Sequence, residues 1–142
     1  MKPDKRKQGK RNKQAGAVWE SKVRANLESK GFIVCKWHNQ VDLDLDKIVP
    51  AKHKFNFFTK VMSLGSGFPD FIVYKLTNEP LGLYDVIGVE CKAGIKGNCY
   101  LDKTEKAKVK WLLTHNVFST ILIATKKKVG RRIVPEYTEL KL

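Results

Sequence analysis

Three charged residues, Asp70, Glu90 and Lys92, have the types and spacing that hydrolytic chemistry requires. Asp70 begins one short apolar run and Glu90 ends another, and each lies ten residues from Pro80 in a turn-forming segment. If the two runs are strands that fold back about Pro80, the two carboxylates lie opposite each other, about 5 Å apart. Side chains alternate along a strand, so Glu90 and Lys92 share a face. Two acids and an amine at a strand end could hold a divalent cation and act on phosphate.

Each of these residues also has an ordinary explanation. An aspartate at a strand start is often a turn residue, and Glu-x-Lys is often a solvated stripe. The flanking residues Ile87, Val89 and Cys91 indicate a buried strand. Paired charges beside a core are costly unless a metal or a partner compensates them. The combination therefore favours a functional site.

A helix is predicted over about 16–30 because Trp19, Val23 and Leu27 recur at helical spacing and Gly31 suits the left-handed cap. Glu20 lies beside this apolar stripe. From the residues alone it is a surface glutamate near a helix N-terminus, where negative charge is favourable. Residues 32–37 are predicted to form a strand.

Asp102 and Glu105 have capping-box spacing, which predicts a helix from near 103. An apolar strand is expected over 117–124, and a final strand or extended tail over 133–140. The order of helix, strand, two-stranded hairpin, helix and strand is typical of an α/β fold. We therefore expect one domain, over residues 15–142, with a mixed central sheet flanked by helices.

Residues 39–66 form the least regular segment. Asp42, Asp44 and Asp46 alternate with leucines but lack the glycine and distal glutamate of a calcium loop, so a polar-out strand or loop edge is expected. Residues 52–60 interleave aromatic and basic side chains. They could form a surface on which bases stack, or a hairpin whose phenylalanines pack on the core, and the second is slightly favoured. The glycine-rich loop over 63–67 could approach a phosphate.

The 142 residues carry a net charge of +14 at pH 7, which indicates an acidic polymer partner, most simply nucleic acid. Residues 1–14 contain seven basic residues and one acid, so we expect a disordered basic arm that tethers phosphates or, alternatively, a solubilising tail. The candidate DNA contacts are Lys10, Arg11, Lys13, Ser66, Lys96, Lys108, Lys126, Lys127, Lys128, Arg131 and Arg132.

No apolar run is long enough to span a bilayer, and no signal peptide is apparent, so we expect no membrane association. The three cysteines include no C-x-x-C pair, which argues against structural zinc and favours reduced thiols in the cytoplasm. The three histidines are scattered and are expected to be surface or packing residues.

Pro69-Asp70 and Glu90-x-Lys92 resemble the two-part signature of the PD-(D/E)xK nuclease superfamily. The segment 16–20 and the strand after it are similar to archaeal Holliday-junction resolvases, although Ser21 and Lys108 stand where those enzymes usually have arginine and glutamine. Trp37-His38-Asn39 followed by residues 67–70 also resembles virus-type replication-repair nuclease domains.

The resemblance implies a restriction-endonuclease-like fold and a catalytic set of Glu20, Asp70, Glu90 and Lys92. Asp70, Glu90 and the backbone carbonyl of Cys91 would bind the metal, with Glu20 acting directly or through water. Hard oxygen ligands suit Mg²⁺ or Mn²⁺. Lys92 would lie beside the attacking water, either as a base or as a stabiliser of negative charge.

The leading hypothesis is a metal-dependent endonuclease that hydrolyses branched DNA in the manner of a Holliday-junction resolvase. Symmetric cleavage of two strands favours a twofold homodimer. Two alternatives stay open. The substrate could be a flap, a single strand or a duplex site, or the chain could be a non-catalytic nucleic-acid-binding module.

Overall fold

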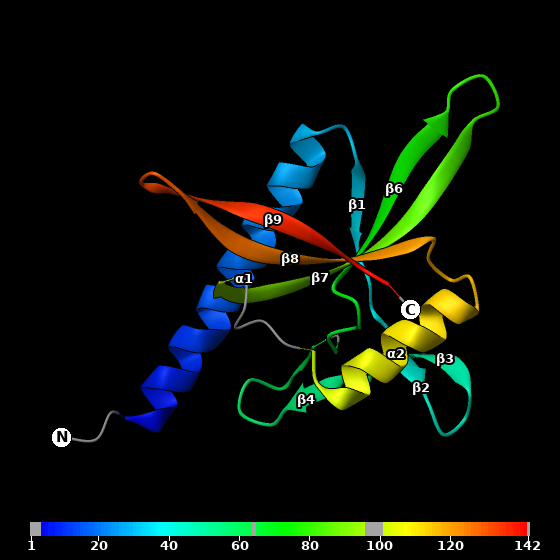
Figure 1. Ribbon diagram of the computed structural model, residues 1–142. Coiled ribbons are helices and arrows are strands. Elements are labelled where there is room, and N and C mark those ends of the chain that lie inside the picture. Colours follow the sequence, from blue (N-terminus) through cyan, green and yellow to red (C-terminus); the bar gives the residue numbers. More distant parts are fainter. Residues whose placement is uncertain (1–3, 64, 96–100, 142) are drawn as a thin grey trace.

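The computed structural model describes residues 4–63, 65–95 and 101–141. Two helices lie within these ranges, α1 (Lys5–Ser29) and α2 (Lys103–Thr114). The strands described are β1 (Ile33–Lys36), β2 (Asn39–Asp42), β3 (Lys47–Pro50), β4 (Lys54–Asn56), β5 (Val61–Ser63), β6 (Phe71–Asn78), β7 (Leu83–Ile95), β8 (Thr120–Val129) and β9 (Arg132–Leu140). Figure 1 shows their arrangement.

A five-stranded mixed sheet in the order β1-β6-β7-β8-β9 forms the centre of the fold. The pairs β1–β6, β6–β7 and β8–β9 are antiparallel, whereas β7 and β8 are parallel. Parallel neighbours require a crossover connection, and α2 lies within the one that joins β7 to β8. The predicted α/β class and mixed central sheet are therefore confirmed.

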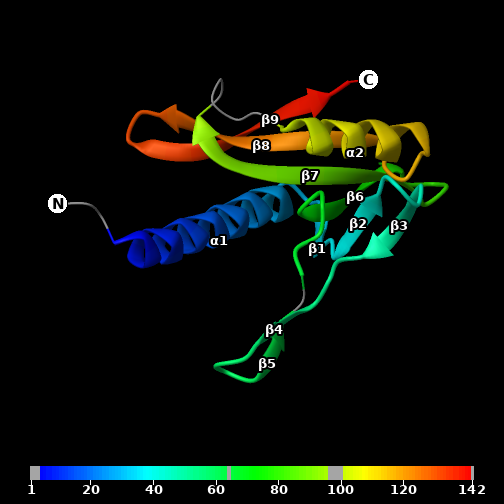
Figure 2. The same ribbon diagram turned by 90° about the horizontal axis from the view of Figure 1, so that it is seen from below.

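Each face of the sheet has its own hydrophobic core. On one face, Trp19, Val23 and Leu27 of α1 pack against Val89 and Ala124. The opposite face is covered by α2, whose Val109 and Leu112 pack with Phe118, Ile121 and Ile123. The alternation of side chains along β7 and β8 separates the two cores, and Figure 2 shows the helices on opposite sides of β7.

Helix α1 begins eleven residues earlier than the sequence predicts. It starts at Lys5, after Asp4, whose side chain caps the helix by accepting a hydrogen bond from the Arg6 backbone at 3.0 Å. The expectation of a disordered arm is wrong for residues 4–14. Lysine, arginine and glutamine are good helix formers, and adding a turn to an existing helix costs far less than nucleating one. Residues 1–3 lie outside the described ranges.

The segment between β1 and β6 folds into two hairpins. In the β2–β3 hairpin, Asp42 accepts hydrogen bonds from the backbones of Asp44 and Leu45, so the alternating aspartates belong to a turn. The β4–β5 hairpin leaves Phe57 and Phe58 83% and 100% exposed. The expectation that these phenylalanines pack on the core is therefore wrong.

Two glycines fix the base of the β4–β5 hairpin. A Cβ atom at Gly65 would overlap the backbone carbonyl of Lys52, so the two legs of the hairpin pass in close contact. A Cβ atom at Gly67 would overlap the carbonyl of Trp37 and lie 2.8 Å from the Asn39 backbone. The return leg is thus packed against the chain that follows β1.

Gly65→Ala is expected to lower the free energy of unfolding by about 1–3 kcal/mol, because the added methyl group must separate two backbone segments. Gly16→Ala is the matched control, since a Cβ atom on α1 at that position meets nothing within 4 Å. It should raise stability by about 0.5–1 kcal/mol. Urea unfolding curves measure both values, and equal effects of the two substitutions would contradict the close approach at Gly65.

Candidate active site

The pairing register of β6 and β7 brings the two predicted carboxylates together. Phe71 pairs with Val89, and the same register continues from Ile72 and Gly88 to Leu76 and Tyr84. One step further towards the start of β6 places Asp70 opposite Glu90. The turn is therefore centred on residue 80, and this sequence prediction is confirmed.

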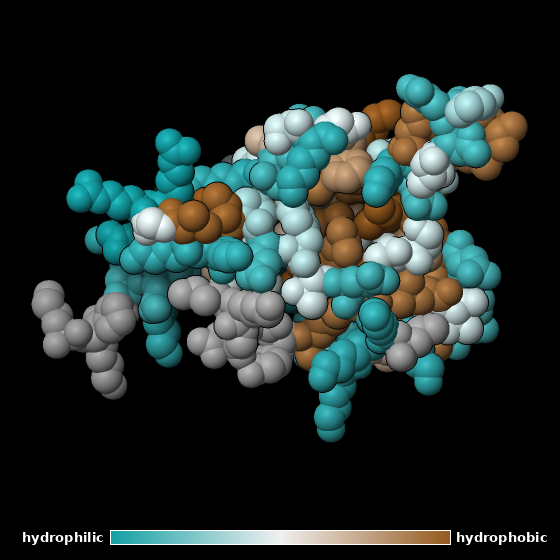
Figure 3. Space-filling model, turned by 45° about the horizontal axis from the view of Figure 1, so that its top comes forward, coloured by the Kyte–Doolittle hydropathy of each residue, from teal (hydrophilic) through white to brown (hydrophobic). Residues whose placement is uncertain are grey.

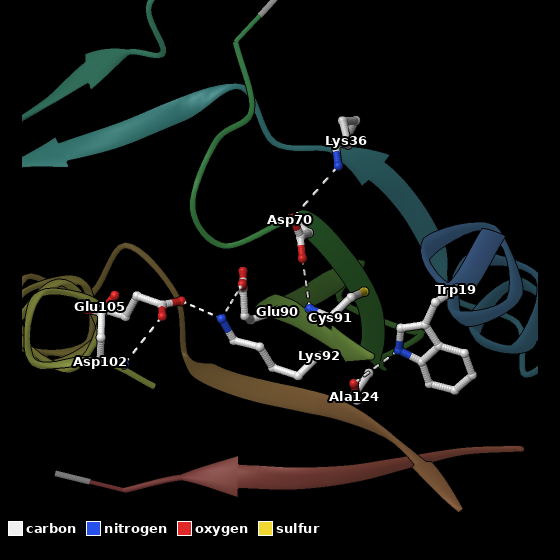
Figure 4. Close-up of polar contacts among 9 residues, drawn as sticks. All are labelled: Trp19, Lys36, Asp70, Glu90, Cys91, Lys92, Asp102, Glu105 and Ala124. Carbon is white, nitrogen blue, oxygen red and sulfur yellow. Dashed lines mark hydrogen bonds and ion pairs between the residues drawn. The ribbon is translucent and has the colours of Figure 1, made fainter. Parts of the chain in front are cut away.

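Both carboxylates are buried at this point. Asp70 is 9% exposed and Glu90 is 7% exposed. One oxygen of Asp70 accepts a hydrogen bond from the backbone N–H of Cys91 at 2.8 Å (Figure 4). Among the described residues, the Oε2 atom of Glu90 is buried without a hydrogen-bond partner. A buried carboxylate oxygen in this state is available to an additional ligand.

Lys92 lies on the same face of β7 as Glu90, as predicted. Its Nζ atom is 3.3 Å from Oε1 of Glu90 and 2.7 Å from Oε2 of Glu105 on α2. Glu105 also forms the predicted capping box with Asp102. That cap was predicted from the sequence, but the ion pair of Glu105 with Lys92 was not. No local sequence pattern predicts the ion pair of Lys92 and Glu105, because it forms only when the β7–β8 crossover places α2 over the sheet.

Glu20 approaches the carboxylate pair through a lysine. The Nζ atom of Lys36 is 2.6 Å from Oε2 of Glu20 and 3.8 Å from Oδ1 of Asp70. Lys36 was not predicted as a site residue, but its pairing with Phe71 at the end of β1 puts it beside Asp70. The structure thus gathers all four predicted catalytic residues, Glu20, Asp70, Glu90 and Lys92, with two additional residues, Lys36 and Glu105.

Burial sets the protonation of this cluster. Desolvation, followed by the charge of Asp70, raises the pKa of Glu90 to about 8. Desolvation also raises the pKa of Asp70, against the opposing effect of its hydrogen bond from Cys91. Burial lowers the pKa of Lys92, but the hydrogen bond to Glu105 and the charges of Glu90 and Glu105 outweigh it and raise this pKa overall. Lys92 is therefore a cation at neutral pH.

The Cys91 side chain takes no part in the cluster. It points to the opposite face of β7, where it packs against the α1 core. Burial, followed by the nearby acids, raises the pKa of this thiol, so it stays protonated and is no thiolate ligand. Only its backbone lies beside Asp70 and Glu90.

Within the described ranges, no group of three or more His, Cys, Asp or Glu side chains is placed to hold a metal ion. The expected ligand set is therefore incomplete as a cluster of side chains, since Lys36 pairs with Glu20. The adjacent pair Asp70 and Glu90 does fit a cation that also takes a backbone oxygen. Hard oxygen donors and the unpartnered Oε2 atom of Glu90 have the chemistry that Mg²⁺ or Mn²⁺ requires.

The predicted DNA contacts fall mainly on one basic region. Lys127, Lys128, Arg131 and Arg132 are exposed around the β8–β9 turn. Lys126 lies over the Trp19 ring at 5.4 Å and lines a pocket of about 370 Å³ together with Arg11. Hydrophilic side chains extend from this end of the molecule, on the left of Figure 3. Lys10 and Lys13 are exposed on α1.

The remaining candidates lie elsewhere. Gln40 donates to the backbone carbonyl of Ser66 at 2.9 Å and accepts a hydrogen bond from Lys108 at 2.8 Å. Ser66 and Lys108 thus line one pocket of about 810 Å³ between α2 and the β2–β3 hairpin. Lys96 lies outside the described residues.

Comparisons with known proteins return nothing, as no family model, curated protein or solved structure matches this chain. Neither of the described helices combines the length and the apolar character needed to cross a membrane.

Glu90→Gln should change how stability depends on pH in metal-free buffer. The pKa of Glu90 is about 8 when folded and about 4.5 in an unfolded chain. Between these values the folded protein holds a proton that the unfolded chain has released, so stability falls as pH rises. Removing this titration should make the variant more stable than the wild type at pH 8.5, by about 1 kcal/mol or more, but not at pH 4.5.

Thermal melting in EDTA across pH 4.5–8.5 measures this difference. The matched control is Glu79→Gln, in the exposed turn of the β6–β7 hairpin. It should leave the pH profile of the wild type unchanged. Parallel profiles for the wild type and Glu90→Gln would show that Glu90 does not titrate in this range.

Proposed function

We propose that this chain is a metal-dependent endonuclease that hydrolyses phosphodiester bonds in DNA. The observation that carries the proposal is the buried pair Asp70 and Glu90, with the cationic Lys92 on the same face. Two buried carboxylates side by side are unfavourable unless protons or cations compensate their charge, and apolar residues would serve a purely structural role at lower cost. The strongly basic surface supports an anionic polymer as the substrate.

The proposed metal ligands are Asp70, Glu90 and the backbone carbonyl of Cys91, with Mg²⁺ or Mn²⁺ as the ion. Glu20 joins directly or through water once Lys36 releases it. A bound divalent ion would neutralise charge on the phosphate and lower the pKa of a coordinated water. It would also lower the pKa values of Asp70 and Glu90, because a cation favours the ionised carboxylates.

Lys92 acts in this proposal as a positioned cation. Its ion pairs with Glu90 and Glu105 hold the ammonium group beside the carboxylates and favour its charged form. The charged form stabilises negative charge that develops on the phosphate during hydrolysis. Of the two roles open from the sequence, charge stabilisation is the one that these contacts favour.

Branched DNA is the proposed substrate, and the restriction-endonuclease-like fold the proposed architecture. Both rest on the resemblance of residues 16–20, 69–70 and 90–92 to PD-(D/E)xK enzymes and Holliday-junction resolvases. The mixed sheet, with α1 on the face opposite α2, is compatible with that architecture. A twofold homodimer would supply the two sites that paired cleavage requires.

Cleavage of a four-way junction, a flap and a linear duplex tests the proposal. The wild type should cut the junction with Mg²⁺ or Mn²⁺ but not with EDTA. Asp70→Asn, Glu90→Gln and Lys92→Gln should each lower the rate by about 100-fold or more, as removal of a transition-state contact does. Junction binding should persist in all three variants.

The matched control is Asp85→Asn, which changes an exposed acid on β7, the strand that carries Glu90 and Lys92. It should cut at the wild-type rate. A second readout does not depend on activity: Mg²⁺ should raise the melting temperature of the wild type but not that of Glu90→Gln. Absence of cleavage on every substrate would contradict the nuclease proposal and favour a non-catalytic DNA-binding module. Cleavage of the flap or the duplex alone would show that branched four-way DNA is not the substrate.

The basic region around the β8–β9 turn should carry much of the DNA affinity. Replacing Lys127, Lys128, Arg131 and Arg132 by glutamine removes four exposed charges. The slope of log affinity against log salt should then fall in magnitude by up to about 3.6, because each phosphate contact releases about 0.9 counterion. Replacing Lys47, Lys75, Lys103 and Lys110, which are exposed elsewhere, is the control. Equal slopes for both variants would contradict a localised basic surface.

A further inference from the structure

The β4–β5 hairpin presents aromatic side chains to solvent at its tip. Phe57 and Phe58 are 83% and 100% exposed, and Phe55 meets Phe57 edge to face with the ring centroids 5.1 Å apart. Figure 2 shows the hairpin projecting from the body formed by the sheet and helices. Exposed apolar groups in a cluster of this kind indicate a binding surface rather than a core.

Hydrogen bonds to one side chain close the turn at the tip of the hairpin. Oδ1 of Asn56 accepts from the backbone of Phe58 at 2.9 Å and from that of Thr59 at 3.3 Å, which closes the turn. Lys60 completes it with φ of 53°. Phe57 and Phe58 therefore lie in a hydrogen-bonded turn.

The base of the hairpin is joined to the strand connection beside the candidate active site. Ala51 donates to the carbonyl of His38 at 2.8 Å, and Phe68 donates to that of Asn39 at 3.0 Å. The close contacts of Gly65 and Gly67 pack the return leg against the same connection, and the chain then enters Pro69 and Asp70. Any ligand held by the tip is thus positioned relative to Asp70.

The positive charge of the β4–β5 hairpin indicates which ligand its aromatic tip binds. Residues 51–69 contain three lysines and no aspartate or glutamate, and Lys52 and Lys60 are exposed on the hairpin. Aromatic rings on a cationic element fit a nucleic-acid strand, because bases stack on the rings while lysines meet the phosphates. Paired bases inside a duplex have no free face. The rings of Phe57 and Phe58 would therefore select unpaired or unstacked bases, and a DNA branch offers such bases.

We propose that the β4–β5 hairpin recognises unpaired bases at a DNA branch by stacking them on Phe57 and Phe58. The proposal rests on the proposed function for its link to cleavage. The chain makes twelve residue steps from Phe58 to Asp70, which span at most about 40 Å at about 3.3 Å each. A base stacked at the tip therefore lies within about twelve nucleotide steps of the phosphate at the candidate active site, at about 3.4 Å for each step.

Binding measured in EDTA tests this without any cleavage. A four-way junction with 2-aminopurine at the branch and a duplex of equal length are titrated with wild type and with the variant Phe57→Ala/Phe58→Ala. The variant should bind the junction about tenfold more weakly, the loss expected for one stacked base, and the duplex less than twofold more weakly. The change in 2-aminopurine fluorescence on binding should disappear.

Two further variants complete the design. Leu81→Ala/Leu83→Ala removes two apolar side chains from the β6–β7 hairpin, where they are 70% and 53% exposed. This variant should bind the junction like the wild type. Phe57→Trp/Phe58→Trp keeps two stacking rings and should restore junction binding. Circular dichroism confirms that the variants are folded, as expected for such exposed positions.

Unchanged junction affinity in the alanine variant would overturn the proposal, as would an equal loss on junction and duplex or a wild type that binds no DNA. A dimeric wild type and a monomeric alanine variant in sedimentation would identify the hairpin as a self-association element instead, which also overturns it. Nuclease activity is scored separately with Mg²⁺. A wild type that stacks bases without cutting refutes only the proposed function, and one that cuts without stacking refutes only this inference.

Discussion

The antiparallel register between β6 and β7 is the constraint on which the rest of the site depends. Pairing of Phe71 with Val89 places Asp70 beside Glu90 and turns Lys92 to the same face. A slip of one residue would reverse every side chain of one strand and send Glu90 into the α1 core. The buried faces oppose that slip, since Val89 is fully buried against α1 and Val73 is 1% exposed on β6. The same apolar residues therefore build the core and align the acids.

The acids are placed where the fold would otherwise avoid charge. Cations on either side offset part of the cost, with Lys36 from β1 near Asp70 and Lys92 from β7 near Glu90. These ammonium groups are themselves tied to Glu20 and Glu105, one on each helix. Elements from both faces of the sheet thus converge on one short stretch of strand, and a raised pKa at Glu90 shows that the compensation is incomplete.

Three features could be predicted from local sequence patterns. They are the centre of the β6–β7 hairpin, the capping box of Asp102 and Glu105, and the helix that carries Trp19, Val23 and Leu27. Each depends on neighbours in the sequence or on a single alternation. Lys36 and Glu105 escaped prediction because their partners are set by strand order and by the crossover, which no nearby residue encodes. The exposed Phe57 and Phe58 escaped for a different reason, since aromatic residues in a strand pattern ordinarily indicate burial.

Residues 5–15, the first turns of helix α1, are all exposed. Arg6 and Lys10, like Lys7 and Arg11, stand four positions apart, where like charges repel each other along a helix. These first turns should consequently fray more readily than the turns around Trp19, and high salt should favour them. A polyanion laid along them would cancel the repulsion and stabilise these helical turns, so part of the binding enthalpy would come from the protein's own backbone.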